Sequence, residues 1–145
     1  MEIDENERVQ LSSYDWNLSD IQGNAVDFNE FKGKVVLVNF WATWCPPCVA
    51  EMPSYQDLYN DYKDKMTFVF LASDDHDKVK KFLTDKNYKL PVYFQTSKVP
   101  QELRSSSLPT TFIIDKNGRI VVDKTGAADW NSGKVREMLD KLISN

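Results

Sequence analysis

The chain has 145 residues, of which 41% are hydrophobic and 28% charged, and its formal net charge is −4 at pH 7. This length fits one globular domain with an ordinary core. The small negative charge argues against nucleic-acid binding, which needs clustered Lys and Arg. No apolar run approaches the roughly 18 residues of a membrane helix.

The first residues are polar and acidic. We expect residues 1–13 to be a lead-in that is mobile at its start, followed by one domain over residues 14–145. The lead-in lacks the basic start and apolar middle of a signal peptide. Either the protein is cytoplasmic, or an export or anchor segment has been removed from it.

Strand signals recur along the whole domain. The run at residues 34–41 is rich in β-branched residues and apolar on both faces, which is typical of a buried central strand. Two hairpins are predicted, each around a turn that contains Gly and Asn. The predicted strands are residues 16–18, 25–28, 34–41, 66–72, 90–95, 111–114 and 119–122.

Apolar residues at helical spacing predict three helices. The first begins at about residue 46 and contains Pro53, which should kink it. The second covers residues 77–86, and a brief helical turn is predicted at residues 100–104. Strands that alternate with helices predict an α/β fold, in which a partly parallel sheet is covered on both faces and the last hairpin forms an antiparallel edge. The third helix carries an apolar stripe of Val135, Met138, Leu139, Leu142 and Ile143.

Both cysteines fall in one motif, Cys45-Pro46-Pro47-Cys48, where the strand at residues 34–41 passes into a helix. Residues three apart on a helix share a face, so the two sulfurs can form a disulfide. The helix N-terminus stabilises a thiolate, the attacking species in thiol-disulfide exchange. We expect Cys45 to be the exposed nucleophile and Cys48, one turn inside, to be the resolving thiol.

The two middle residues of the motif shape this chemistry. Pro46 and Pro47 suit the first helical turn and donate no hydrogen bond to a sulfur, whereas the Cys48 N–H remains available. This predicts weaker thiolate stabilisation and favours a reductant. The alternative is a pair of redox-silent buried thiols.

Metal and cofactor chemistry find little support. Two cysteines and one histidine are too few ligands for a structural zinc site, so no metal and no cofactor is expected. The sole histidine, His76, lies in an acidic stretch at residues 74–77, which is interpreted as a solvated loop.

The segment Phe40-Trp41-Ala42-Thr43-Trp44-Cys45-Pro46-Pro47-Cys48 resembles the active-site segment of the thioredoxin superfamily. Residues 33–41 and 108–115 resemble its TlpA/ResA-like branch, and the resemblance runs from about residue 14 to the C-terminus. It implies a thioredoxin fold with a central mixed sheet flanked by helices and an N-terminal β-hairpin extension.

The resemblance also implies site residues. Leu108-Pro109 matches the cis-proline loop, which faces the dithiol in this superfamily and pairs with the bound substrate chain. Trp44 would flank the dithiol as a flat apolar contact surface, and Trp41 would lie in the core.

Two positions near the motif differ from ordinary thioredoxin. The aspartate that thioredoxins bury on the preceding strand is replaced here by Asn39, which cannot titrate. The ResA-like branch carries a glutamate at the place of Glu51, and it is implicated there in tuning the cysteine pair. A carboxylate close to the inner thiol can take its proton if burial raises the pKa of that carboxylate. Glu51 is therefore the third candidate catalytic residue, and a solvated helix glutamate is the alternative.

The resemblance implies a thiol-disulfide oxidoreductase, which we expect to be a monomeric reductant of protein disulfides served by an upstream electron-donor protein. It adds an extracytoplasmic setting, such as the periplasm, often with a membrane tether that this chain does not contain. A cytoplasmic location is the alternative. A disulfide-donating oxidase, a non-enzymatic binding module and a peroxiredoxin are the competing functions, the last disfavoured by Ala42, where a threonine is needed.

Overall fold

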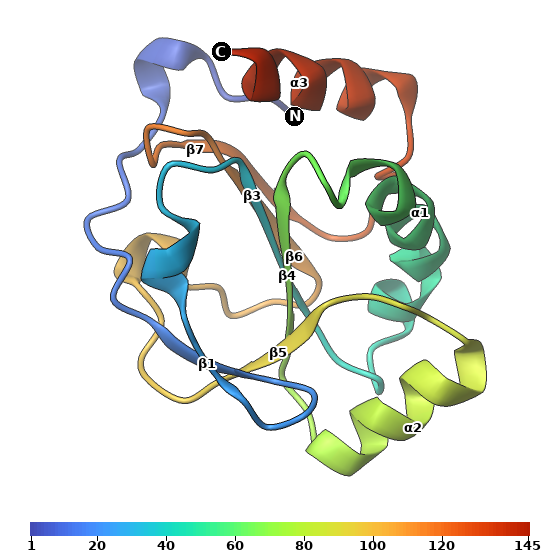
Figure 1. Cartoon of the computed structure of the whole chain (residues 1–145). Helices are drawn as coiled ribbons and strands as arrows, with labels where there is room; N and C mark the ends of the chain where they lie inside the picture. The colour runs from blue at the N-terminus through green and yellow to red at the C-terminus, as the bar shows by residue number, and fades with distance from the viewer.

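Seven strands form one mixed sheet at the centre of the computed structural model, which describes residues 1–145 (Figure 1). Their order across the sheet is β2-β1-β5-β4-β3-β6-β7. The β3–β4 and β4–β5 pairs are parallel, and the other pairs are antiparallel. The strands are β1 (Asn17–Asp20), β2 (Ala25–Asp27), β3 (Val36–Trp41), β4 (Thr67–Ala72), β5 (Val92–Gln95), β6 (Thr110–Ile114) and β7 (Ile120–Thr125).

Three helices cover one face of this sheet. They are α1 (Pro46–Tyr62), α2 (His76–Lys86) and α3 (Gly133–Ser144). Their buried side chains join one apolar cluster with Leu37 and Trp41 of the sheet. None of these helices combines the length and apolarity that crossing a bilayer requires.

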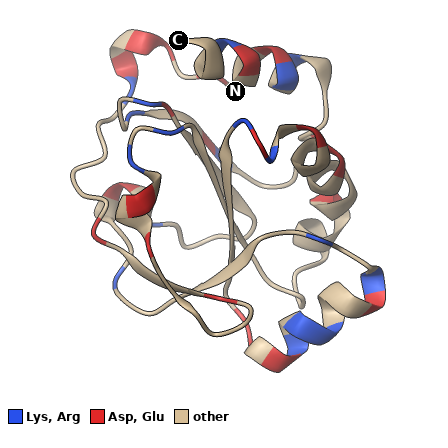
Figure 2. Cartoon of the chain, in the orientation of Figure 1, with Lys and Arg blue, Asp and Glu red and all other residues tan.

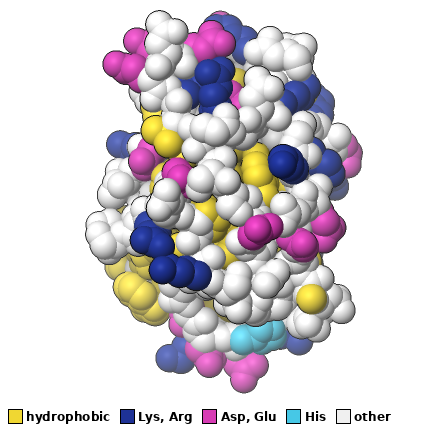
Figure 3. Space-filling model, turned by 90° about the vertical axis from the view of Figure 1, so that its left-hand side faces the viewer, with side chains coloured by type: hydrophobic (Ala, Val, Ile, Leu, Met, Phe, Trp, Pro, Cys, Tyr) yellow, Lys and Arg dark blue, Asp and Glu magenta, His cyan; other side chains and the backbone are white.

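The other face is covered without any α-helix. Three 3₁₀ turns lie along the chain, η1 (Glu5–Glu7), η2 (Phe28–Phe31) and η3 (Gln101–Leu103). The last two supply Phe28 and Leu103 to a second apolar cluster beneath this face. The prediction that both faces are covered is confirmed, and the second cover is irregular chain. Basic and acidic side chains are dispersed over this side of the molecule without a large patch of either sign (Figure 3).

The N-terminal hairpin is confirmed as β1 and β2, and β1 extends the sheet by pairing with β5. The lead-in at residues 1–13 runs along the opposite edge. The Ile3 N–H donates to the Val121 carbonyl, the Ile120 N–H donates to the Val9 carbonyl, and Leu11 is buried. The lead-in therefore docks on β7, and mobility at its start stays a prediction.

The position of β3 decides where the cysteines lie. All six of its residues are buried, because the strand is flanked by β4 and β6 and covered on both faces. Leu37, Asn39 and Trp41 alternate with residues that face the other cluster. Phe40 pairs with Thr110 across the β3–β6 ladder. Residue 109 therefore lies beside the end of β3, from which the chain leads to the first cysteine.

The C-terminal helix shows how local signals and packing agree. Ser132 caps α3, and its hydroxyl accepts a hydrogen bond from the Val135 N–H at 3.2 Å. The predicted apolar stripe is buried apart from Ile143, which is half-buried against the same cluster. The Pro53 of α1 lies inside that helix, as expected.

We expect Leu139→Ala to destabilise the protein by about 2–5 kcal/mol, since it removes a fully buried side chain and leaves a cavity between α3 and the sheet. Urea denaturation monitored by tryptophan fluorescence measures this loss. The matched control is Lys141→Ala on the exposed side of α3, which should change the free energy of unfolding by less than about 0.5 kcal/mol. Equal effects of the two substitutions would contradict the packing described here.

Candidate active site

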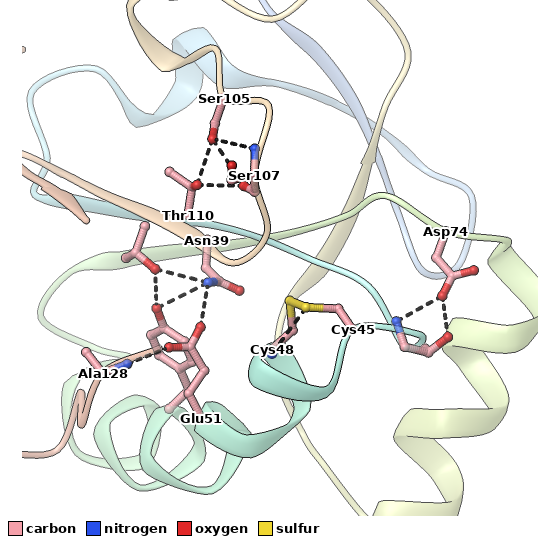
Figure 4. The surroundings of a disulfide bond; sticks show 12 residues. Asn39, Cys45, Cys48, Glu51, Asp74, Ser105, Ser107, Thr110 and Ala128 are labelled. Carbon is pink, nitrogen blue, oxygen red and sulfur yellow. Dashed lines mark hydrogen bonds between the residues drawn. A yellow bond between two sulfur atoms is a disulfide. The ribbon is translucent and has the colours of Figure 1, made fainter. Parts of the chain in front are cut away.

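Cys45 and Cys48 form a disulfide at the N-terminus of α1 (Figure 4). Cys45 is the N-cap residue, and its Sγ accepts a hydrogen bond from the Cys48 N–H at 3.3 Å. Cys45 is 5% exposed and Cys48 is 0% exposed. The predicted ranking of accessibility therefore holds, but the expected exposure of Cys45 does not: both residues are buried in the disulfide form.

The residues next to the disulfide form an apolar rim. Pro46 and Pro47 occupy the first two helical positions, where a missing N–H costs nothing, and both are exposed. Trp44 is 65% exposed, which makes it one of three large hydrophobic side chains on the surface. The sequence carries no charged side chain from Phe40 to Ala50, and this part of the ribbon is uncharged in Figure 2. The motif itself therefore adds no charge to the surface around Cys45.

The loop before the motif is anchored by Asp74. The Thr43 N–H donates to Asp74 Oδ2 at 2.9 Å, and the Thr43 hydroxyl donates to the same oxygen. Burial alone would raise the pKa of Asp74, but the hydrogen bonds from Thr43 and Asp75 outweigh it and lower the pKa below its ordinary value.

Asp74 lies in a partly exposed loop, as expected, but it also binds Thr43, whereas the expected loop is wrong for His76 and Asp77, which begin α2. The signal for the contact between Asp74 and Thr43 was available, because the carboxyl ends of the adjacent parallel strands β3 and β4 must meet at the same edge of the sheet.

The peptide bond between Leu108 and Pro109 is cis, as the resemblance implied. Hydroxyl groups hold the loop before it. Ser105 Oγ lies 2.7 Å from Thr110 Oγ1, which also donates to the Ser107 carbonyl at 2.7 Å. Leu108 is half-buried and packs against the cluster that contains both cysteines. The structure thus places the predicted substrate-contact loop against the same apolar cluster as the disulfide.

Glu51 is buried beneath α1, with only 3% of its surface exposed. Its Oε2 accepts hydrogen bonds from Trp130 Nε1 at 2.8 Å and from the Ala128 N–H at 3.2 Å. Its Oε1 accepts one from Asn39 Nδ2 at 3.2 Å. Burial raises the pKa of Glu51 to about 7, and these hydrogen bonds oppose the rise. The alternative of a solvated helix glutamate is therefore wrong.

Asn39 links Glu51 to a group of buried hydroxyls. Its Nδ2 also donates to Tyr55 Oη at 3.2 Å and to Thr111 Oγ1 at 3.0 Å, and these two oxygens lie 2.6 Å apart. Burial and the neighbouring Glu51 raise the pKa of Tyr55 well above its ordinary value. Asn39 is thus a buried core amide whose two N–H hydrogens are shared among three oxygens.

Sequence reasoning missed several of these partners. No motif marks Trp130, Ala128 or Tyr55, and the resemblance of residues 108–115 gave no role to Thr111. Only the three-dimensional packing of α1 against β3, β6 and the segment before α3 shows that they hold Glu51 and Asn39. No group of three or more His, Cys, Asp or Glu side chains is arranged to hold a metal ion.

Comparison with known proteins agrees with this geometry. The model of the AhpC/TSA family matches residues 9–123. The thiol-disulfide oxidoreductase ResA of Bacillus thuringiensis subsp. konkukian is 34% identical over 128 residues, which cover 86% of this chain and 73% of the relative. The chain belongs to the ResA-like thiol-disulfide oxidoreductases of the AhpC/TSA family.

Solved structures extend the comparison of this ResA-like protein. The pneumococcal exposed lipoprotein thioredoxin of Streptococcus pneumoniae is 26% identical with a TM-score of 0.70, over 89% of this chain and 98% of that one. A secreted thiol-disulfide isomerase of Corynebacterium glutamicum shares the fold, with a TM-score of 0.79 at 22% identity over 100% of this chain and 92% of that one. The predicted thioredoxin fold and thiol-disulfide oxidoreductase function are confirmed.

The buried carboxylate makes a pH-dependent contribution to stability. Because folding raises the pKa of Glu51 from 4.5 to about 7, the folded ResA-like protein keeps a proton that the unfolded chain has already lost between these values. The contribution of Glu51 to stability is therefore full below pH 4.5 and is lost as the pH rises to about 7. We expect Glu51→Gln to gain about 3 kcal/mol relative to the wild type between pH 4.5 and pH 8, as measured by urea denaturation. Parallel pH profiles of the two proteins would contradict the raised pKa.

Proposed function

We propose that the protein reduces disulfide bonds of protein substrates, with Cys45 as nucleophile and Cys48 as resolving thiol. The observation that carries this direction is the single hydrogen bond at the Cys45 sulfur, from the Cys48 N–H at 3.3 Å. A thiolate with few donors is weakly stabilised, which lowers the tendency of the couple to take electrons. Pro46 and Pro47 add no N–H donor to this site.

The proposed reaction has two exchange steps. The Cys45 thiolate attacks one sulfur of the substrate disulfide, whose other sulfur leaves as a thiolate. Cys48 then loses its proton and attacks the Cys45 sulfur, which releases the second substrate thiolate and forms the disulfide of Figure 4. The substrate gains two electrons, and an upstream dithiol protein returns two electrons to this pair.

Glu51 is the proposed acceptor of the Cys48 proton. It lies one helical turn after Cys48 on the buried side of α1, and burial raises its pKa to about 7. A base with a pKa close to the working pH is the most effective at accepting a proton. No hydrogen bond joins Glu51 to either sulfur in the disulfide form. Glu51 would therefore accept the Cys48 proton only during the exchange step, when Cys48 attacks the mixed disulfide.

Substrates are proposed to bind across the rim of Trp44, Pro46 and Pro47 and the loop of Leu108 and Pro109. The exposed indole offers a rigid apolar contact. The backbone of Leu108 would pair with the substrate chain, as the family resemblance implies. Because these five residues carry no charge, shape and apolar contact would dominate the recognition of the segment around the substrate cysteine.

An extracytoplasmic setting is proposed, with cytoplasmic placement as the alternative. Similarity to the exposed lipoprotein thioredoxin of Streptococcus pneumoniae supports it. A membrane tether outside these residues, a monomeric state and a donor protein upstream belong to the same proposal.

The equilibrium reduction potential of the Cys45–Cys48 couple tests the direction of electron flow. We expect a value of about −270 mV or lower, the range of reducing thioredoxins, in a dithiothreitol or glutathione buffer read by tryptophan fluorescence. A value of about −120 mV would make the protein an oxidant. A protein without a measurable couple would be a binding module.

Substitution of each cysteine separately tests the two roles. Cys48→Ser should accumulate a mixed disulfide with substrate, because the resolving thiol is gone, and Cys45→Ser should accumulate none. Non-reducing electrophoresis with mass spectrometry measures both. Trapping through Cys48 instead would reverse the assignment.

A substitution of Glu51 tests its role as proton acceptor. In the protein with both cysteines present, Glu51→Gln should lengthen the lifetime of the mixed disulfide at least about tenfold, since glutamine cannot accept the Cys48 proton.

A further inference from the structure

One buried acceptor at the redox centre lacks a hydrogen-bond donor. Asn39 is 0% exposed, and its Oδ1 is among four buried side-chain atoms in the protein without a partner. Its Nδ2, by contrast, has three partners. Buried polar groups are rarely left unpaired, so this oxygen calls for an explanation in another state of the protein.

The placement of Asn39 shows where this oxygen is directed. Asn39 lies on β3 beneath α1, and its Nδ2 contacts Glu51 and Tyr55 of that helix. Cys48 is on the same buried side of α1, one turn before Glu51. In Figure 4 the oxygen end of the amide points toward the disulfide, and the nitrogen end points toward Glu51.

The charge on Glu51 fixes this orientation of the amide. Two of the three partners of Nδ2 are hydroxyls, which can donate or accept equally well. An ionised carboxylate can only accept, so turning the amide would place Oδ1 against Glu51 Oε1 and cost the hydrogen bond between them. With Glu51 ionised, Oδ1 therefore faces the sulfurs.

Reduction supplies the donor that this oxygen lacks. In the disulfide neither sulfur carries a hydrogen. When the S–S bond breaks, the pair takes up two electrons from the donor dithiol, which becomes a disulfide and releases two protons. One of these protons resides on Cys48 Sγ, and the other goes to solvent, so Cys45 remains a thiolate. We propose that Asn39 is a positioning residue of the redox centre, whose Nδ2 holds the Glu51 carboxylate and whose Oδ1 accepts a hydrogen bond from the reduced Cys48 thiol.

This hydrogen bond has two consequences, which rest on the proposed dithiol–disulfide cycle. It stabilises the dithiol form relative to the disulfide form, in which Oδ1 is unpaired. It also holds the proton on Cys48, so Cys45 alone is the thiolate that meets the substrate. Asn39 would thereby separate the roles of two cysteines that share one helical turn.

The S–H stretching band of Cys48 tests the hydrogen bond directly. Cys45→Ala leaves Cys48 as the only thiol of the chain, and its infrared band is recorded at pH 8, where Glu51 is ionised. We expect a band at lower wavenumber than that of a free thiol, moving to higher wavenumber when Asn39→Leu is added. Thr111→Val is the matched control, because it removes a partner of Nδ2 and leaves Oδ1 in place, so it should not move the band.

Redox equilibrium measures the effect on the native pair. With both cysteines present, Asn39→Leu should shift the equilibrium with dithiothreitol about tenfold toward the disulfide, which corresponds to about 30 mV. Thr111→Val should shift it less than about twofold. A merely structural role for Asn39 would alter folding stability without moving the S–H band.

Two results would overturn the proposal: a Cys48 band at the free-thiol position in Cys45→Ala, or an equilibrium that Asn39→Leu leaves unchanged. If Asn39→Leu fails to fold, the band of Cys45→Ala alone decides. Failure of the proposed reductant function is a separate result, since it appears as a missing or strongly oxidising couple in the native protein, while the S–H band still reports the hydrogen bond.

Discussion

Three parts of the chain that are distant in sequence meet at the carboxylate of Glu51. The residue itself comes from α1, Asn39 comes from β3, and Ala128 and Trp130 come from the segment that leads into α3. These hydrogen bonds replace the hydrogen bonds to water that the carboxylate loses when it is buried. The same contacts fix how α1 lies on the sheet, and therefore where its first turn presents Cys45.

The burial of this carboxylate opposes stability near neutral pH and suits the proposed role of Glu51 as a proton acceptor. A glutamate at the surface would keep an ordinary pKa and stay ionised throughout the working range. Burial raises the pKa of Glu51 to about 7, so the group can exchange a proton where thiols react. Apolar residues at this position would give a simpler core, but they could neither accept a proton nor orient the Asn39 amide.

Local sequence pattern predicted the helices and strands well, and with them the position of the cysteine motif between a strand and a helix, because both depend on short-range rules. The strand at β3, the helix that begins at residue 46 and the hairpins at both ends of the domain follow from periodicity and turn residues. The cis bond before Pro109 and the importance of Glu51 came from family resemblance rather than from spacing.

The remainder depended on long-range packing. Trp130 reaches Glu51 across 79 positions of the chain, and no local pattern distinguishes it from other core aromatics. In the sequence, Asp74 is indistinguishable from a solvated acidic residue. The parallel pairing of β3 and β4 places it beside Thr43 in the structure. Likewise, the docking of the lead-in on β7 rests on backbone hydrogen bonds, which composition does not reveal.

The site divides its tasks between an apolar exterior and a polar interior. Outside, Trp44 and the two prolines present an uncharged surface, on which a substrate disulfide can approach without losing strong hydration. Inside, Glu51 is the buried carboxyl group, and its pKa is raised to about 7, whereas the pKa of the partly exposed Asp74 is lowered. Ionisation of Glu51 as the pH rises adds negative charge one helical turn from Cys48 and two turns from Cys45, which opposes thiolate formation. The two titrations therefore act against each other, and the reactivity of Cys45 should vary less steeply with pH than that of an isolated thiol.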